Sequence, residues 1–329
     1  MEDYVIGVDG GGTETVGILA NEHGLILSQG KVGATNYQVV GAERLKSEIH
    51  KLFQQMGVGP DKSTRKVSHV FIGLAGVGRE SDRKEVSALF QNLPYLGNVT
   101  VESDAQVALS GAFSGEEGII IIAGTGAICF GRDKNGPVVR SGGWGYLLGD
   151  EGSGYFIGQQ AIIAALKDLD GRGEKTELRP AIEKRYQLAS IDEIIPKIYK
   201  QQIDRAEIAA LAPLVFGLAA ENDAEAADII RRTGHEQGRL AKAVAERLAL
   251  INKKIRVALI GGVFNQRDIL ENEIAKELYE LSWDVEIIEP EFPPVVGAVL
   301  LALDKLQKPI NENVLANLRQ SDALKALSY

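Results

Sequence analysis

A carboxylate followed by a run of glycines, close to the start of the chain, is the feature best suited to chemistry. The order is Asp9, Gly10, Gly11, Gly12 and Thr13. Consecutive glycines adopt positive φ angles without a steric penalty, and their N–H groups can converge into a nest that binds an anion such as phosphate. A carboxylate beside such a nest can hold a hydrated Mg²⁺ against the phosphates, so Asp9 is a candidate metal ligand. The alternative is an ordinary glycine-rich turn.

The segments on either side of the glycines predict the kind of loop. Residues 4–8 and 16–19 are short, apolar and rich in β-branched side chains, which predicts two strands joined as a hairpin. A Walker loop would need a lysine and a hydroxyl residue in front of a helix, and no such string occurs. A dinucleotide-binding fingerprint would also open a helix. We therefore expect a phosphate-binding hairpin of neither common type.

A second glycine-rich hairpin is predicted at residues 119–131. An apolar run precedes Gly124, Thr125 and Gly126, and another apolar run follows them. Each copy has the order strand, glycine turn, strand, second turn and strand, with little residue identity between the copies. The chain therefore predicts a structural duplication, in which two phosphate hairpins facing each other across a cleft would grip one nucleotide.

Carboxylates elsewhere in the chain lie in contexts that suit catalysis or sugar binding. Asp104 follows the predicted strand 99–102 and begins a helix, where an aspartate is commonly only an N-cap. Asp150 and Glu151 stand in a glycine-dense stretch, where carboxylates either solvate a turn or accept hydrogen bonds from neighbouring sugar hydroxyls. The residue types alone leave both interpretations open.

Size and composition exclude several classes of protein. The 329 residues suffice for two domains, and 45% hydrophobic with 25% charged residues is typical of a globular protein. A formal net charge of −9 argues against nucleic acid or an anionic membrane as partner. The single cysteine, Cys129, excludes a disulfide framework and a cysteine zinc cluster. Neither a signal peptide nor a membrane-spanning run is visible, so we expect a cytoplasmic protein.

Hydrophobic periodicity predicts strands and helices through most of the chain. Helices are expected at residues 42–56, 83–92, 155–169, 223–251, 268–281 and 295–306, and further strands at 25–27, 67–74, 138–139, 255–260 and 285–288. The polar tail after residue 311 predicts one more helix, whose apolar face would carry Leu315, Leu318, Leu324 and Leu327.

Motifs spread over most of the chain together carry a family resemblance. They are Asp9–Thr13, Ala34–Asn36, Ser103–Ala105, Gly124–Gly126, Gly142–Gly145, Leu148–Ser153 and Leu259–Gly262. The chain resembles the N-acetylglucosamine kinase family, also called the BadF/BadG/BcrA/BcrD ATPase family, of the sugar kinase, actin and heat-shock chaperone superfamily. The resemblance implies an α/β fold of two ribonuclease H-like (actin-like ATPase) domains with a cleft between them. Ala127 departs from the family, where serine is common, so one side-chain hydrogen bond is missing from the phosphate or sugar site.

The resemblance also implies a role for each motif. Asp104 would orient a sugar hydroxyl and accept its proton late in phosphoryl transfer. Gly261 and Gly262 would let the adenosine lie on the backbone. The implied phosphate contacts are Gly10, Gly11, Gly12, Thr13, Gly124, Thr125 and Gly126, and the implied sugar contacts are Asn36, Asp104, Trp144, Gly145, Asp150 and Glu151.

The sequence thus predicts a kinase that uses ATP and Mg²⁺ to phosphorylate an amino sugar, most simply N-acetylglucosamine at its 6-hydroxyl. Glucosamine, N-acetylmuramate and glucose stay open as substrates. One alternative is the ATPase activator of a 2-hydroxyacyl-CoA dehydratase, although its iron–sulfur cluster takes four thiolates and a dimer of this chain has two. Another alternative is an actin-like nucleotide switch without a small substrate.

The expected domain organisation is discontinuous. The small lobe would comprise residues 1–115 and 308–329, because the resemblance places a terminal helix on the N-terminal lobe. The large lobe would comprise residues 116–307, and the expected assembly is a homodimer.

Overall fold

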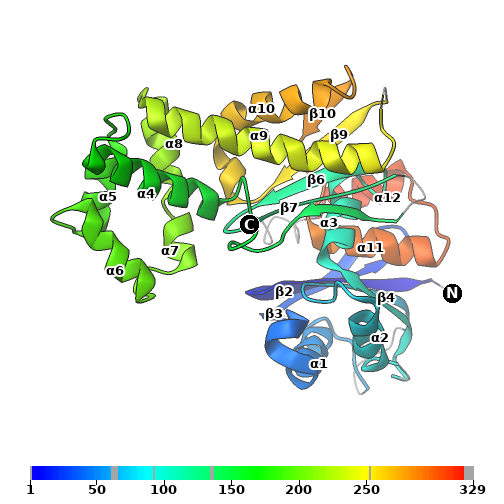
Figure 1. Ribbon diagram of the computed structural model, residues 1–329. Helices are drawn as coiled ribbons and strands as arrows, with labels where there is room; N and C mark the ends of the chain where they lie inside the picture. The colour runs from blue at the N-terminus through cyan, green and yellow to red at the C-terminus, as the bar shows by residue number, and fades with distance from the viewer. Residues whose placement is uncertain (1, 61–65, 92, 134–136, 252, 322–329) are drawn as a thin grey trace. The chain divides into compact units, whose positions relative to one another are not determined.

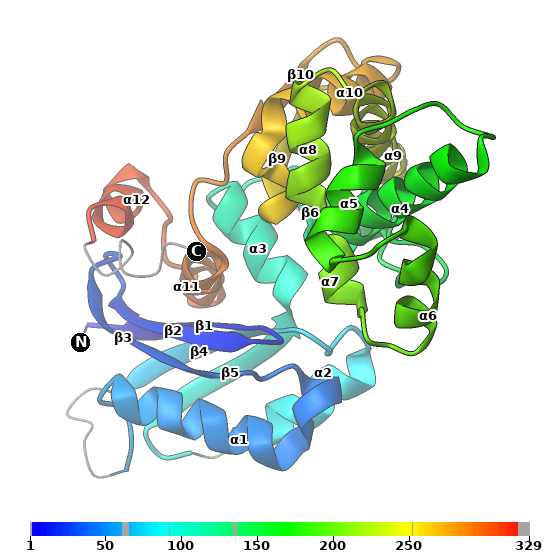
Figure 2. The same cartoon turned by 90° about the vertical axis from the view of Figure 1, so that its left-hand side faces the viewer.

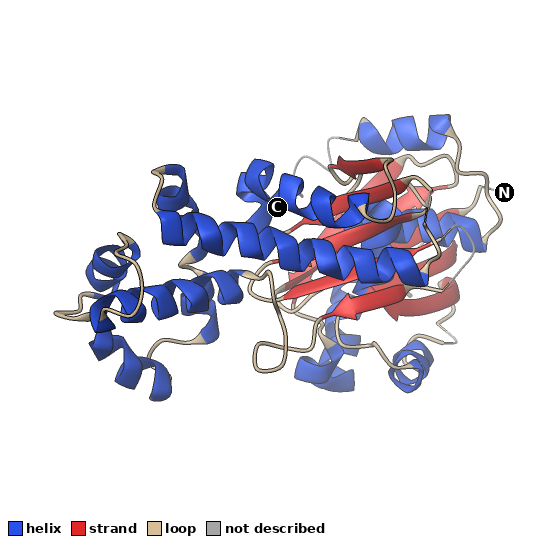
Figure 3. Ribbon diagram, turned by 45° about the horizontal axis from the view of Figure 1, so that its top comes forward, coloured by secondary structure: helices blue, strands red, loops and turns tan. Residues whose placement is uncertain are grey.

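The computed structural model describes residues 2–60, 66–91, 93–133, 137–251 and 253–321. The chain divides into two compact units, Met1–Glu117 with Pro290–Tyr329 and Gly118–Glu289. Each unit combines one β-sheet with helices, as Figures 1 and 3 show. Each unit is described by itself below.

The first unit is built on a five-stranded mixed sheet in the order β3-β2-β1-β4-β5. The first three strands along the chain form an antiparallel meander, and the last two run parallel to β1. The strands are β1 (Tyr4–Gly10), β2 (Glu14–Asn21), β3 (Ile26–Gly33), β4 (Val67–Leu74) and β5 (Leu96–Ser103).

Helices cover both faces of this sheet, as Figure 2 shows. Ile6 and Val8 of β1 point to one face and Val5 to the other, because successive side chains of a strand alternate. The first face packs against α1 (Tyr37–Gln55) and α2 (Glu80–Ala88), and the second against α3 (Asp104–Ala112), α11 (Pro294–Lys305) and α12 (Glu312–Arg319).

The second unit repeats the sheet of the first. Its order is β10-β9-β6-β7-β8, with an antiparallel meander followed by two strands parallel to β6. The duplication predicted from the two glycine hairpins is therefore confirmed by topology. The strands are β6 (Gly118–Ala123), β7 (Ala127–Arg132), β8 (Val139–Gly142), β9 (Ile255–Ile260) and β10 (Val285–Ile288).

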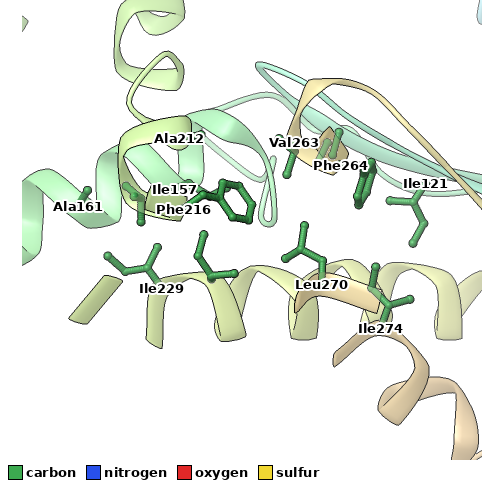
Figure 4. Close-up of a cluster of buried hydrophobic side chains, with 14 of the residues drawn as sticks. Ile121, Ile157, Ala161, Ala212, Phe216, Ile229, Val263, Phe264, Leu270 and Ile274 are labelled. Atoms are coloured by element: carbon green, nitrogen blue, oxygen red, sulfur yellow. The ribbon is translucent and has the colours of Figure 1, made fainter. Parts of the chain in front are cut away.

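Most of the second unit outside its sheet is helical. The core includes apolar side chains of β6 and of the helices around it, among them Ile121, Ile157, Phe216 and Ile229 (Figure 4). The helices are α4 (Gly154–Asp170), α5 (Leu178–Tyr186), η1 (Ile191–Glu193), α6 (Ile194–Tyr199), α7 (Arg205–Ala209), α8 (Ala212–Ala220), α9 (Ala224–Arg247), η2 (Gly262–Gln266) and α10 (Arg267–Tyr279).

The chain returns to the first unit earlier than the sequence predicted. The expected boundary lay before residue 308, with the helix 295–306 in the large lobe, whereas the structure places Pro290 and all of α11 in the first unit. α11 is buried along almost its whole length against β1, β4 and α3. Gly297 permits this close packing, because a Cβ there would lie 2.0 Å from the carbonyl oxygen of Val107 in α3.

Three further elements differ from the predicted ranges. The third strand extends to Gly33, since it pairs with β2 through polar residues that give no apolar pattern. α1 begins at Tyr37, with a kink at Gly41 whose φ is 71°. α2 covers residues 80–88, earlier than the predicted 83–92.

The prediction of a helix after residue 311 is confirmed by α12, which ends at Arg319. Leu318 is fully buried and Leu315 is partly buried in the first unit, while Leu324 and Leu327 lie outside the described residues. Lys308 precedes this helix and forms ion pairs with Asp3 and Glu22. The segment from Lys308 to Leu318 is thus attached to the first unit by packing and by charge.

Replacing Leu318 by alanine should destabilise the protein by about 2–5 kcal/mol, the cost of a cavity in place of a buried leucine. Chemical denaturation followed by circular dichroism measures this free energy of unfolding. The control is Asn313→Ala, at an exposed position of the same helix, which should stay within about 0.5 kcal/mol of the parent. Equal stability of both variants would show that α12 is loosely attached.

Candidate functional site

The carboxyl ends of the parallel strands bring predicted residues of the first unit to one edge of its sheet. In the register of β1, β4 and β5, Gly10 pairs with Leu74 and Leu74 pairs with Ser103. The hairpin after Gly10 and the side chain of Asp104 therefore start at the same edge, about 10 Å apart across two strand spacings. Ligands of open α/β sheets bind at this edge.

Backbone hydrogen bonds fix the orientation of the first hairpin. The Gly11 carbonyl accepts the N–H groups of Thr35 at 3.0 Å and Asn36 at 3.1 Å, just before α1 begins. The carbonyls thus face the protein. The N–H groups of Gly12 and Thr13 have no acceptor within the described residues, and both residues are exposed. These two N–H groups are available to an anion, although none of Gly10, Gly11 and Gly12 has the positive φ that glycines can adopt.

Asn36 has two uses in the structure. Its side-chain oxygen caps α1 by accepting the N–H of Gln38 at 3.1 Å, as a turn residue would. Within the described part of the chain its amide nitrogen donates no hydrogen bond, so its two N–H donors are left for a ligand. The role of Asn36 in sugar binding stays a prediction.

Asp104 is the first residue of α3, and Ser103 is the N-cap. The Asp104 carboxylate accepts the N–H of Ala105 at 2.9 Å, so it does satisfy one helix donor. Loss of hydration among the surrounding protein atoms raises the pKa of Asp104, against the opposing effect of backbone hydrogen bonds from Ala105 and from its own N–H. The side chain nevertheless keeps solvent-exposed surface, so a substrate can reach it.

The second unit orients its hairpin in the same way as the first. The Gly124 carbonyl accepts the N–H of Gly154 at 2.8 Å, and the Thr125 carbonyl accepts that of Tyr155 at 3.4 Å. Both donors lie in the first turn of α4, which Ser153 caps. The N–H groups of Thr125 and Gly126 have no acceptor within the described residues. Two pairs of outward N–H groups, one pair per unit, therefore suit phosphate.

A cavity of about 520 Å³ lies beside the second hairpin. Its walls are mostly small or apolar side chains, which suits the flat face of a nucleobase. Gly261, which follows the last residue of β9, has φ 113°, and a Cβ at this position would lie 2.4 Å from the Ala123 carbonyl oxygen. The lining residues are Gly124, Thr125, Gly154, Ala206, Ala209, Ala210, Ala212, Pro213, Phe216, Gly262, Val263, Asn265 and Gln266.

Asp150 is buried, with 5% of its surface exposed, and has the left-handed φ of 61°. One carboxylate oxygen lies 3.5 Å from the N–H of Ala127, and the other lies 3.7 Å from Nη2 of Arg205. The carboxylate therefore lies against the second hairpin. Its predicted contact with a sugar stays a prediction.

The other predicted sugar residues lie on the exposed loop before α4. Trp144 and Glu151 are exposed, and Arg140 stacks over the Trp144 ring at 4.3 Å. Gly145 has φ 85°. A broad exposed aromatic ring suits the apolar face of a sugar, and the tryptophan is not the core residue that would be its commonest alternative.

The residues that sequence reasoning missed lie at the start of α4 and in α7. Gly154, the alanines of α7 and Arg205 carry no motif by themselves. The pattern Asp204 to Glu207 is a capping box and could have located α7, but nothing in the sequence places that helix against the hairpin.

The residues present fit a magnesium ion at Asp9. This carboxylate is half-buried at the end of β1, directly before the hairpin. No cluster of three metal-ligating side chains occurs among the described residues. Mg²⁺ needs none, because it commonly binds one or two carboxylates together with water and substrate phosphates.

The structure also addresses the predictions made for Cys129 and for membrane-spanning segments. The thiol is fully buried in β7, and this burial raises its pKa, as expected of an inert core cysteine. Among the described residues, every helix is too short or too polar to cross a lipid bilayer.

A profile of the BadF/BadG/BcrA/BcrD ATPase family matches residues 6–302, which is most of the chain. The chain belongs to this family. The resemblance stated from the sequence motifs is thereby confirmed, and the duplicated sheets agree with the actin-like ATPase fold.

Relatives of known name are similar to this chain over nearly their whole length. The N-acetylmuramic acid/N-acetylglucosamine kinase of Clostridium acetobutylicum is 38% identical over 300 residues, which cover 91% of this chain and 98% of the relative. The N-acetyl-D-glucosamine kinase of Dictyostelium discoideum is 32% identical over 316 residues, 92% of this chain and 98% of the relative.

Solved structures agree with the fold. A candidate N-acetylglucosamine kinase from Chromobacterium violaceum superimposes with a TM-score of 0.68 at 28% identity, covering 92% of this chain and 99% of that one. A ROK family glucokinase from Streptomyces griseus, in complex with glucose and AMPPNP, superimposes with a TM-score of 0.51 at 18% identity, with the same coverage. At that identity the glucokinase supports the fold alone.

Two alanine substitutions separate the structural from the binding role of the first hairpin. In Gly10→Ala the new Cβ would lie 2.3 Å from Thr35 Oγ1, so the melting temperature should fall. In Gly12→Ala the Cβ meets no atom within 4 Å, so the fold should be unchanged. If phosphate lies against Gly12, the added methyl group should nevertheless hold it away from the N–H groups of the hairpin, and KM for ATP should rise roughly tenfold, which corresponds to about 1.4 kcal/mol. Thermal melts measure the first effect and ATP titrations of the kinase reaction measure the second. An unchanged KM in Gly12→Ala would contradict phosphate binding at this hairpin.

Proposed function

We propose that this protein is an ATP-dependent amino-sugar kinase whose substrate is N-acetylglucosamine, phosphorylated at the 6-hydroxyl. The observation that carries the proposal is the pair of hairpins, each with two N–H groups that have no acceptor in the described part of the chain. Next to one hairpin lies a cavity suited to a nucleobase, and at the sheet edge of the other lies an accessible carboxylate, Asp104. The names of the Clostridium and Dictyostelium relatives support the substrate class.

Each part of the site has a proposed task. The cavity beside Gly262 binds the adenosine, and the hairpins bind phosphate through their N–H groups. Asp9 holds Mg²⁺, which when bound offsets phosphate charge. The exposed loop with Trp144, Gly145 and Glu151, together with Asn36, binds the sugar. Asp150, which lies against the second hairpin, is a further proposed sugar contact.

Phosphoryl transfer to the sugar does not require a strong base. The sugar hydroxyl oxygen forms a bond to the γ-phosphorus, the bond from that phosphorus to the ADP oxygen breaks, and the hydroxyl proton passes to the Asp104 carboxylate. Because the transition state is loose, the proton leaves late and the carboxylate mainly orients the hydroxyl. An aspartate suffices for this role.

The choice among sugars is tested by ATP consumption. N-acetylglucosamine, N-acetylmuramate, glucosamine and glucose are offered separately, and the product is analysed by mass spectrometry and NMR. The Clostridium relative is named for the first two sugars, so phosphorylation of N-acetylmuramate as well would extend the proposal. Full ATP hydrolysis without any sugar would favour the nucleotide-switch alternative.

The activator alternative is opposed by Cys129. Its thiol is fully buried in β7, and a dimer would supply two thiolates where an iron–sulfur cluster takes four. The homodimer and the cytoplasmic location stay predictions.

Asp104→Asn should lower kcat about a hundredfold or more, because a positioned acid–base group is lost. The matched control is Glu80→Gln, which neutralises the first residue of α2 as Asp104→Asn neutralises the first residue of α3. The control should keep parental turnover, and ATP affinity should be retained in both. Turnover of Asp104→Asn within a few-fold of the parent would reduce Asp104 to a helix residue.

The raised pKa of Asp104 predicts the pH dependence of kcat/KM for the sugar. The carboxylate is the active form, so activity should be level above this pKa and fall as the pH drops through it. The acidic limb should therefore lie above about 3.9, the ordinary value of aspartate. Circular dichroism at each pH serves as the control for folding. A limb at or below the ordinary value would count against Asp104 as the group that titrates.

A further inference from the structure

The start of α7 holds Arg205 in a fixed place within the second unit. Asp204 caps this helix and accepts the N–H of Glu207, and the Glu207 side chain accepts the N–H of Asp204, both at 2.9 Å. This reciprocal capping box satisfies two helix donors and locks the first turn. Arg205, as the first helical residue, therefore projects from a well-defined backbone.

The guanidinium of Arg205 makes few contacts for its five donors. Its Nη2 lies 3.7 Å from a carboxylate oxygen of Asp150, which is an ion pair too long for a hydrogen bond. Its buried Nε has no acceptor, and the Tyr146 ring lies 5.5 Å from its Cζ. Within the described residues Arg205 makes no hydrogen bond through its side chain. A partly buried cation is thus held in place with its donors unused.

These donors lie against the second hairpin. A Cβ on Gly126 would be 3.1 Å from Nη2 of Arg205. Gly126 and Thr125 are the residues whose N–H groups have no acceptor among the described residues, and Thr125 lines the cavity together with Ala206 and Ala209 of α7. A phosphate bound at this hairpin would find the guanidinium at its side.

The simplest other role for Arg205 is to neutralise Asp150, which is 95% buried and needs a counter-charge. The long separation argues that this is not its whole role, because an arginine that served only a carboxylate would form bidentate hydrogen bonds. A guanidinium fork also matches phosphate oxygens, and its charge is permanent.

We propose that Arg205 is a catalytic residue that donates hydrogen bonds to the terminal phosphate of ATP and stabilises the charge on it during transfer. The inference rests on the proposed function and adds to it an arginine supplied by the chain itself. Bond changes are those given above: the hydroxyl oxygen bonds to phosphorus, the bond to ADP breaks and the proton passes to Asp104. Arg205 keeps all of its protons throughout.

The test compares Arg205→Gln and Arg205→Lys with the parent and with a matched control, Arg185→Gln. Arg185 also stacks over a tyrosine ring, at 5.9 Å from Tyr186, and lies on α5 away from the cavity lining. In Arg205→Gln kcat should fall about a hundredfold to a thousandfold, the scale of one lost donor to developing charge. Affinity for AMPPNP should fall, affinity for ADP should stay within twofold, and Arg205→Lys should recover part of kcat. The control should match the parent.

If Arg205 acts only by positioning Asp150, the substitutions should change the kinetic constants in a different way. In that case the loss would appear mainly in KM for the sugar, and adding Arg205→Gln to Asp150→Asn would cause no further loss of kcat. Either result, or a kcat within a few-fold of the parent, would overturn the proposal. If Arg205→Gln melts well below the parent, Arg205→Ala assayed with and without added guanidinium ion replaces it, and recovery of kcat by the ion supports the proposal.

The experiments distinguish failure of the proposed function from failure of the proposal for Arg205. A parent protein that transfers phosphate to none of the four sugars would refute the amino-sugar kinase itself. An active parent with an equally active Arg205→Gln variant would refute only the role of the arginine.

Discussion

The contact between the carbonyls of each glycine hairpin and the segment that starts the next helix is the constraint on which the sites depend. Gly11 accepts from Thr35 and Asn36 in the first unit, and Gly124 accepts from Gly154 in the second. Since the carbonyls are used inside the protein, the neighbouring amides are directed outward, where an anion can accept from them. Residue identity is almost absent between the two hairpins, so it is the backbone geometry that has been kept.

The two units differ in what lies between the third and fourth strands of their sheets. In the first unit the described part of this interval holds one helix, α1, whereas in the second unit the interval holds the helices from α4 to α9. The longer insertion supplies the apolar wall of the cavity and the arginine beside the hairpin. The residue before the glycines differs as well, with Asp9 in the first unit and Ala123 in the second. A shared scaffold thus gives a carboxylate edge in one unit and an apolar cavity in the other.

The region around Asp150 is not arranged for stability alone. A left-handed backbone at a residue other than glycine and a buried carboxylate each cost free energy, of the order of 1–3 kcal/mol for the backbone. Asparagine and aspartate tolerate this conformation best, which is consistent with the residue found there. Local strain of this kind persists where surrounding structure holds it in place, and here the hairpin, α7 and the start of α4 do so.

By itself the sequence determined the strands, the duplicated hairpins, the family and the candidate carboxylates, because these depend on local patterns. Runs of β-branched residues, glycine turns and helical spacing act over a few residues and are visible without the fold. Asp104 and the hairpin at Gly10 could be expected at one sheet edge for the same reason, once both were seen to follow strands. Polar β3 and the early start of α2 gave no such pattern and were placed inaccurately.

Only the tertiary structure decided which distant segments meet. The apolar sequence of α11 does not predict that this helix packs on β1 and α3. A helix that is hydrophobic on all sides has no single apolar face from which its partner could be inferred. The closeness of Gly126, Asp150 and Arg205 likewise spans 79 residues of the chain, counted from 126 to 205. Contacts of this kind are set by packing and by the buried charge of Asp150, whose partner no local spacing could reveal.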